Sequence, residues 1–349
     1  MSVKNPYPKL LIVGVVVTIL VVIAAMLAWC VSFLAPTAGQ FWGVIALCIP
    51  LILGVNCVVM LFWIMRRRWI LALLPLIALC VNGEYLNSVV QISLPSNEEY
   101  DLRVASLNVD NFIWKDDIPN TVQEVIDVAL RERFDVFSLQ EYQFNTKPER
   151  ADSVADAFRA QLGFEMVHDE GIALVSRFPI LASDYKRFED SGNDYMWADI
   201  LTPHDTVRIV SVHLQTSGIS ALRAQYRNDS ISREAPVDEV VETLEKNYRL
   251  RVRQAKVMRQ IIDTTRHRVV LMGDFNDTPS SYTYRAMLGR MNDAFRTSGM
   301  GWGGTFRPML GFLRIDYIFY NDGFRSTDYR ILNDPLSDHK LVTADLCFR

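Results

Sequence analysis

Residues 269–277 read Val-Val-Leu-Met-Gly-Asp-Phe-Asn-Asp, and this stretch decides the fold of the larger part of the chain. Four consecutive apolar residues have the length and composition of a strand that is buried on both faces. The strand ends at Gly273, and the polar side chains of Asp274 and Asn276 follow. Polar groups that follow a buried strand lie at the edge of a sheet, where binding and catalytic residues gather. Taken alone, the stretch predicts a strand that ends at the edge of a sheet, where Gly273 and Asp274 form either a plain turn or part of a functional site.

Six further short apolar runs lie on either side of this strand, and several of them also begin or end in polar residues. They are 104–109, 136–139, 172–175, 207–214, 315–320 and 341–348. Between them, residues 122–130, 154–162 and 244–262 repeat apolar side chains at helical spacing. Thr121 and Glu124 match the capping box that opens a helix. We expect residues 101–349 to form one mixed α/β domain.

The polar residues at the strand ends each have an ordinary explanation when taken singly. Asn108, Asp110 and Glu141 are residue types that usually occupy surface turns, and a histidine such as His213 inside an apolar strand is more often a hydrogen-bonded core residue. As a set, however, these residues supply hard oxygen ligands for a divalent cation, two imidazoles, a carboxylate base and a carboxamide donor. The full set is Asn108, Asp110, Glu141, His213, Asp274, Asn276, Asp316, Asp338 and His339.

The order and spacing of these motifs resemble those of the endonuclease/exonuclease/phosphatase superfamily. The matching pieces are LNVDN, LQE, GIALVSRFPI, SVHL, GDFND, RIDYIFY and SDH, which begin at residues 107, 139, 171, 211, 273, 314 and 337. The resemblance covers residues 101–349. It implies a four-layer α/β sandwich, in which two mostly antiparallel sheets are flanked by helices and the site lies at one end of the sheets.

The resemblance also implies a role for each residue in the hydrolysis of a phosphate ester. A hard cation, Mg²⁺ or Mn²⁺, would stabilise charge on the phosphoryl oxygens, because such cations prefer oxygen ligands. Its expected ligands are Glu141 first, then Asn108, Asp110 and Asp338. The expected catalytic residues are Asp274 to activate water, Asn276 to donate hydrogen bonds, His339 held by Asp316 to bind the phosphoryl group, and His213 as a second imidazole.

The first 93 residues are predicted to be a membrane anchor of helices. Residues 10–34 and 41–65 are 25 residues each without a charge, more than the ~20 that a helix needs to cross a bilayer. Residues 69–90 are predicted to be a third span, although Asn82, Glu84 and Asn87 near its end leave open a re-entrant or interfacial helix. Residues 94–100 are predicted to be a linker to the domain at 101–349.

Basic residues predict how the anchor is oriented. Lys4 and Lys9 precede the first span, and the basic triplet at residues 66–68 separates the second span from the third. Because basic loops stay in the cytoplasm, the N-terminal residues and the triplet are expected on the cytoplasmic side. With three spans, the larger domain lies outside the cytoplasm, and the protein is expected in a bacterial inner membrane with a periplasmic or extracellular domain. With two spans, the domain is cytoplasmic.

Charge and motifs together define the expected function. The chain has 36 basic and 40 acidic residues, of which five and three lie in the first 100, so residues 101–349 carry a net charge of −6. This part lacks the excess of basic residues that is typical of a protein that binds nucleic acid tightly. We expect a membrane-anchored phosphoesterase that favours phosphodiesters, with a nucleic acid, a phospholipid or a small phosphorylated molecule as substrate. The alternatives are a phosphomonoesterase acting on an inositol- or lipid-type phosphate, and a catalytically silent, membrane-tethered binding domain.

Overall fold

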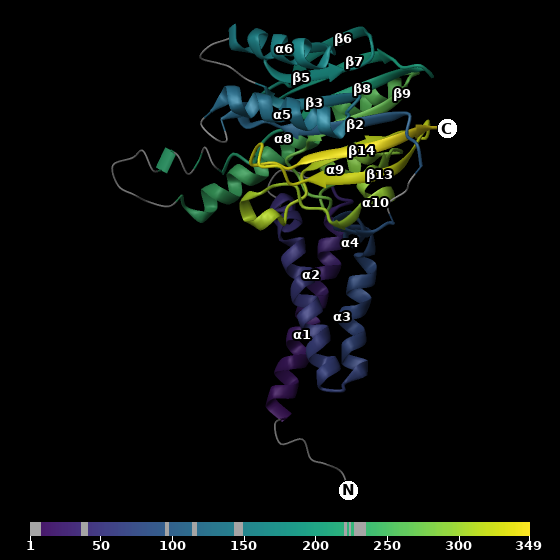
Figure 1. Cartoon of the computed structure of the whole chain (residues 1–349). Helices are drawn as coiled ribbons and strands as arrows, with labels where there is room; N and C mark the ends of the chain where they lie inside the picture. The colour runs from purple at the N-terminus through teal and green to yellow at the C-terminus, as the bar shows by residue number, and fades with distance from the viewer. Residues whose placement is uncertain are drawn as a thin grey trace.

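The computed structural model shows a bundle of apolar helices and a larger domain at one end of that bundle (Figure 1). It describes residues 8–35, 41–94, 98–113, 117–142, 149–219, 222, 225–226 and 235–349. The first described helix begins at the end of the bundle that lies away from the larger domain, and the C-terminus lies in that domain.

The larger domain is built on two six-stranded sheets, each with one parallel pair of strands among antiparallel ones. In the first sheet the order is β13 (Phe324–Leu332), β14 (Leu341–Phe348), β2 (Leu102–Asn108), β3 (Val136–Tyr142), β5 (Gly171–Ser176) and β4 (Glu165–Asp169). In the second it is β10 (Asn292–Asp293), β12 (Asp316–Tyr320), β9 (Arg268–Asp274), β8 (Thr206–His213), β7 (Asp194–Leu201) and β6 (Ile180–Arg187).

The two sheets pack face to face, and helices cover both outer faces. Because side chains alternate along a strand, Val104 of β2 and Val270 of β9 meet in the central core, whereas Leu107 and Leu271 point outward. Helices α5 (Ile118–Glu132) and α6 (Glu149–Leu162) cover the first sheet, and α8 (Val237–Thr264) and α9 (Tyr282–Leu288) cover the second. The predicted four-layer sandwich is confirmed.

Two sequence-based predictions of local structure need correction. Strands β4, β6, β7 and β13 were not predicted, because each mixes polar with apolar residues and lacks a continuous apolar run. The capping box is also wrong: Asp117 is the N-cap of α5, and its side chain accepts a hydrogen bond from the Asn120 amide. Thr121 lies inside the helix, where its hydroxyl donates to the Asp117 carbonyl.

The anchor consists of α1 (Pro8–Val31), α2 (Trp42–Met65), α3 (Trp69–Val81) and α4 (Gly83–Val89). Two of these, α1 and α2, are long and apolar enough to cross a membrane, and a third span exists if α3 and α4, bent by 65°, are counted as one. Polar side chains inside the bundle are hydrogen-bonded: Trp63 donates to the Thr18 hydroxyl at 2.7 Å, and Asn82 donates to the Ala25 carbonyl at 3.1 Å. Such pairing offsets the high cost of polar groups in an apolar medium.

The bundle and the domain are joined by specific contacts. At the start of α2, the amides of Gly43 and Val44 donate to the Glu245 carboxylate on α8. After α4, β1 (Val90–Ile92) pairs with β11 (Met300–Trp302) of the domain as an antiparallel ribbon. The chain is thus paired with the domain before residue 94. Of the predicted 94–100 linker, residues 95–97 lie outside the described part of the chain.

Candidate active site

The site begins with side-chain alternation along four strands. Residues Asn108, Gln140, His213 and Asp274 lie at the ends of β2, β3, β8 and β9, and each has the same parity as the core residues of its strand. All four therefore point into the space between the two sheets, and all are buried. Beneath them, the hydroxyls of Ser138 and Ser211 bond to each other and to Gln140, which separates the site from the apolar core.

Asp274 lies at the centre of this group. Strand register places it directly beside His213 on β8 and Asp316 on β12. Its Oδ2 accepts hydrogen bonds from the amides of Asn108 at 3.1 Å and Asn276 at 3.2 Å. Burial raises the pKa of this carboxyl. The carboxylate is thus held in place by two carboxamides and is more basic than an exposed aspartate.

His339 approaches Asp274 from the other sheet, just before β14. Its Nε2 lies 3.7 Å from Asp274 Oδ2, and its Nδ1 lies 3.0 Å from both oxygens of Asp316. Burial lowers the pKa of His339, but the carboxylates of Asp316 and Asp274 outweigh burial and raise it to about 10. The Asp316 pairing therefore fixes the ring and keeps it cationic.

His213 has the opposite electrostatic character. It is fully enclosed, and burial lowers the pKa of its imidazole despite the nearby Asp274 carboxylate. Its Nε2 is buried without a hydrogen-bond partner in the described structure, 3.7 Å from both Glu141 Oε1 and Asp274 Oδ2. A buried polar atom without a partner is costly, so the position of this nitrogen at the site suits contact with a bound ligand.

Three carboxylates lie on the first-sheet side of the site. Glu141 accepts a hydrogen bond from the side-chain amide of Asn108 at 2.9 Å, and the side-chain oxygen of Asn108 in turn accepts one from the backbone amide of Asp110 at 3.0 Å. Burial, together with the neighbouring carboxylates of Asp338 and Glu141, raises the pKa of Asp110 to about 6. Carboxylates this close together repel one another, so binding of a cation among them is favoured.

The backbone is strained where these residues lie. Asp110, Glu141 and Asn276 have φ values of 44°, 54° and 50°, which non-glycine residues rarely adopt. Glu141 also occupies a β-bulge, since the register of β3 against β5 shifts between Gln140 and Tyr142. Strained, non-glycine residues gather at functional sites, where the surrounding structure holds them in place.

One group of side chains has the spacing of a metal site, and it differs from the predicted ligand set. The ligand atoms of Asp274, Asp316 and His339 lie within 4.8 Å of one another. Asp316 and His339 are, however, hydrogen-bonded to each other. The predicted ligands Glu141, Asn108 and Asp110 lie together beside this group, and Asp338 Oδ1 is 4.0 Å from His339 Nε2. The structure thus brings all nine predicted residues to one edge of the sandwich.

Two residues that the sequence did not single out support the His339–Asp316 pair. The Thr305 hydroxyl accepts hydrogen bonds from the amides of Ile315 and Asp316, at 3.1 and 3.2 Å. The ring of Phe306 packs against the His339 ring with 5.0 Å between centroids. Neither residue lies in a motif that ends a predicted strand, so their contribution is visible only in three dimensions.

Comparison with known families decides the assignment. The model of the endonuclease/exonuclease/phosphatase family matches residues 105–339, which is most of the chain. The chain belongs to the endonuclease/exonuclease/phosphatase family. Membership makes it a hydrolase that acts on phosphate esters. A second model, described as a domain of unknown function, matches residues 9–89. Comparison with curated protein sequences finds no match.

Solved structures share the fold of this endonuclease/exonuclease/phosphatase domain. A mannosyl-6-phosphatase from Bacteroides thetaiotaomicron is 18% identical with a TM-score of 0.52, over 71% of this chain and 100% of its own. D. rerio TDP2, complexed with a single-strand DNA product, is 15% identical with a TM-score of 0.52, over 70% and 98%. The human Nocturnin catalytic domain with bound sulfate is 16% identical with a TM-score of 0.51, over 74% and 96%. At these identities the likeness shows the fold alone.

Proposed function

We propose that this chain is a membrane-anchored, divalent-metal-dependent phosphodiesterase in which Asp274 activates the attacking water. One observation carries the proposal: Asp274 Oδ2 lies within 3.7 Å of two imidazoles and accepts hydrogen bonds from two carboxamides. A carboxylate of raised pKa within reach of both imidazoles is suited to take a proton from water beside a bound phosphate.

The donor set fits a hard divalent cation. Glu141, Asp110 and Asp338 supply carboxylate oxygens, and Asn108 supplies an amide oxygen, which are the ligands that Mg²⁺ and Mn²⁺ prefer. Burial raises the pKa of Asp110 in this group, and the nearby carboxylates of Asp338 and Glu141 add to that effect. When bound there, the cation would stabilise negative charge on the phosphoryl oxygens.

The remaining residues bind and orient the phosphate. The cationic ring of His339 donates from Nε2 to a phosphoryl oxygen, while Asp316 fixes its orientation through Nδ1. The neutral ring of His213 has an unpartnered Nε2 on the same side. The side-chain amide of Asn276 donates to the Leu214 carbonyl at 3.0 Å and to Asp274 Oδ2 at 3.2 Å, so in this arrangement it orients the Asp274 carboxylate.

Charge favours a diester over a monoester. A diester carries one negative charge, whereas a monoester carries up to two and is typically met by arginine or lysine. Among the described residues, the basic side chains beside the site motifs are engaged elsewhere. Arg314 pairs with Asp293, Arg307 donates to the carbonyls of Ser337 and Asp334, and Lys340 donates to the Gly304 carbonyl.

The geometry of the anchor supports a domain outside the cytoplasm. α1 begins, α2 ends and α3 begins at the end of the bundle that lies away from the domain (Figure 1). The basic residues at 66–68 lie at that end, and basic loops stay in the cytoplasm. We therefore place the domain on the periplasmic or extracellular side of a bacterial inner membrane.

The full-length chain in nanodiscs tests the enzymatic part of this proposal. Hydrolysis of bis-p-nitrophenyl phosphate and p-nitrophenyl phosphate is compared with Mg²⁺, with Mn²⁺ and with EDTA, and His339→Ala and Asp274→Asn serve as inactive controls. We expect faster cleavage of the diester, abolished by EDTA and by both substitutions. Preference for the monoester would replace the diester assignment, and activity that survives both substitutions would contradict the site.

A further inference from the structure

The ribbon between the anchor and the domain has one entirely apolar face. In its antiparallel register Val90 lies opposite Trp302 and Ile92 lies opposite Met300, so the four side chains share a face. All four are exposed, with 87% of Ile92 and 61% of Met300 accessible. A two-stranded ribbon has little core of its own, so a wholly apolar exposed face needs a partner.

Two further residues extend this face into a larger apolar surface. Leu94 follows Ile92 with the same alternation and is 87% exposed, and Phe312 meets the Trp302 ring edge-on at 5.8 Å and is 56% exposed. We call these six residues, Val90, Ile92, Leu94, Met300, Trp302 and Phe312, the junction patch.

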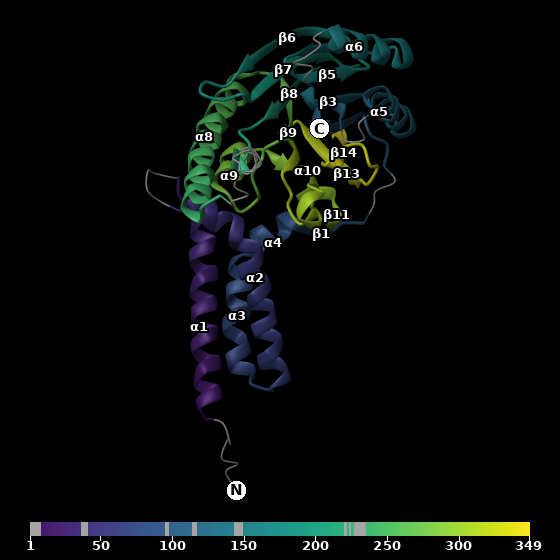
Figure 2. The same ribbon diagram turned by 90° about the vertical axis from the view of Figure 1, so that its left-hand side faces the viewer.

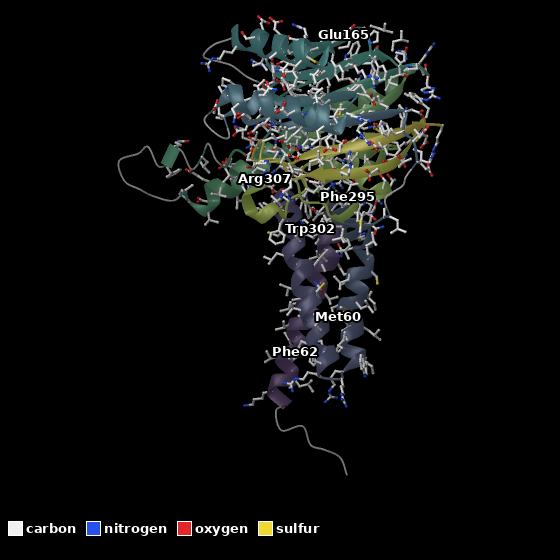
Figure 3. All side chains as sticks on the ribbon, viewed as in Figure 1. Met60, Phe62, Glu165, Phe295, Trp302 and Arg307 are labelled. Carbon is white, nitrogen blue, oxygen red and sulfur yellow. The ribbon has the colours of Figure 1, made fainter. Side chains whose placement is uncertain are left out.

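The position of the junction patch identifies its partner. The ribbon starts at the residue after α4, and Trp302 lies where the helix bundle meets the domain (Figure 3). Seen from the side, β1 and β11 lie next to α4 on the domain surface that faces the bundle (Figure 2). The patch thus lies at the end of a bundle whose helices α1, α2 and α3 also expose apolar side chains. Tryptophan and other apolar residues at this level are typical of a membrane interface.

We propose that the junction patch inserts into the surface of the bilayer that holds the anchor, so that the active site works on phosphate esters carried by lipids. Burying the patch in the interface would remove apolar area from water, at about 25 cal/mol per Å². The part of the proposal that concerns substrate rests on the proposed phosphodiesterase activity. Contact with the bilayer does not.

The patch is connected to the active site through one short segment. Trp302 donates to the Gly311 carbonyl at 3.0 Å, which fixes it against the loop that carries Phe312. The other end of this loop turns back, with the amides of Thr305 and Phe306 donating to the Leu313 carbonyl. Phe306 then packs on His339, and Thr305 holds Asp316. The residues that bind phosphate therefore lie one loop away from the proposed membrane surface.

Fluorescence tests contact with the bilayer without using activity. The full-length chain and its Trp302→Phe variant are placed in nanodiscs of phosphatidylcholine and of phosphatidylcholine brominated near the head-group end of its acyl chains. The difference between the two proteins isolates the emission of Trp302. We expect bromine to quench this difference signal strongly. An equal Trp302 signal in brominated and unbrominated discs would overturn the proposal.

A matched pair of substrates tests the consequence for catalysis. Hexadecyl p-nitrophenyl phosphate enters the disc, and ethyl p-nitrophenyl phosphate stays in water, but both present the same reacting group. Ile92→Gln combined with Met300→Gln should lower kcat/KM for the hexadecyl ester roughly fivefold or more and leave the ethyl ester unchanged, since only surface contact is lost. Leu181→Gln combined with Leu201→Gln, on the distant β6 and β7, should change neither rate.

The outcomes separate the two parts of the proposal. Equal loss on both esters, or no loss on the hexadecyl ester, would contradict the link between patch and substrate. If the wild-type chain hydrolyses neither ester, the proposed phosphodiesterase activity fails, and the quenching experiment still decides whether the patch enters the bilayer.

Discussion

At the scale of single residues, the site is organised by opposite electrostatic environments around one carboxylate. Burial lowers the pKa of His213, whereas Asp316 and Asp274 overcome burial at His339 and raise its pKa to about 10. Two imidazoles within 3.7 Å of Asp274 therefore carry different protonation states at neutral pH. Groups whose pKa values are pushed apart in this way serve different roles in acid–base chemistry.

Asp274→Asn tests the role of the central carboxylate. The amide keeps the shape of the side chain but cannot take a proton, so we expect kcat to fall by about 10²–10⁴-fold. The free energy of unfolding should stay the same or rise, because the buried charge is removed along with its desolvation cost. Steady-state kinetics and urea unfolding measure the two quantities. A variant that loses stability along with activity would instead indicate a structural role.

Asp316→Asn tests the charge state of His339. The carboxylate of Asp316 raises the pKa of His339 against burial, so its removal should lower that pKa by about 1–3 units. If activity requires the imidazolium, the alkaline limb of the pH–rate profile shifts to lower pH by the same amount. Thr305→Val is the control, because it removes the hydroxyl that accepts a hydrogen bond from the Asp316 backbone amide but leaves the Asp316 carboxylate charge in place. If the pH–rate profile of Asp316→Asn does not move, activity does not require the imidazolium form of His339.

At the scale of elements, β9 positions the site through a close approach to β8. Gly273 has φ of +142°, and a Cβ there would lie 2.0 Å from the Val212 carbonyl oxygen. Only glycine therefore fits opposite Val212, and the next register pair along the two strands is His213 with Asp274. The Gly-Asp dipeptide is a geometric requirement of the site as much as a chemical one.

Gly273→Ala should therefore destabilise the domain and displace Asp274. We expect a loss of at least about 2 kcal/mol in the free energy of unfolding, because a backbone contact must open and the φ value is strained for alanine. Gly192→Ala is the matched control, since a Cβ there meets no atom within 4 Å. Urea unfolding of the two variants gives the comparison. Equal stability of both would contradict the steric argument.

The elements also show which features the sequence could predict. The apolar run of β9 and the polar residues after it predicted both a strand and a site, because the buried residues and the polar site residues follow one another directly in the sequence. Strand β6 lacked such a run, since its residues are mostly exposed at the edge of a sheet, where packing does not require apolar side chains. The bulge at Glu141 and the support of His339 by Phe306 arise from pairing between distant segments, so no local pattern records them.

At the scale of the whole molecule, the anchor is built into the domain and is not a flexible tether. Besides the Glu245 carboxylate at the start of α2, the Ser280 hydroxyl donates to the Ala46 carbonyl, and the buried Arg314 donates to the Ser88 carbonyl while it pairs with Asp293. Arg314 lies two residues before Asp316, so the anchor contacts the segment that leads into β12, where Asp316 bonds His339. These contacts fix the orientation of the site relative to the helix bundle.

This rigid connection makes membrane topology a sharp test of the whole arrangement. The basic residues at 66–68 and the contacts of α2 with α8 lie at opposite ends of α2, so three crossings place the domain opposite the basic loop. In a bacterial host, alkaline phosphatase fused to Arg349 through a flexible linker should be active, and green fluorescent protein fused at the same position should not fluoresce. Fusions that end at Arg68 should give the reverse. Fluorescence from both the Arg349 and the Arg68 fusions would contradict this arrangement, because the domain and the basic loop would then lie on the same side of the membrane, whereas the domain contacts the opposite end of α2.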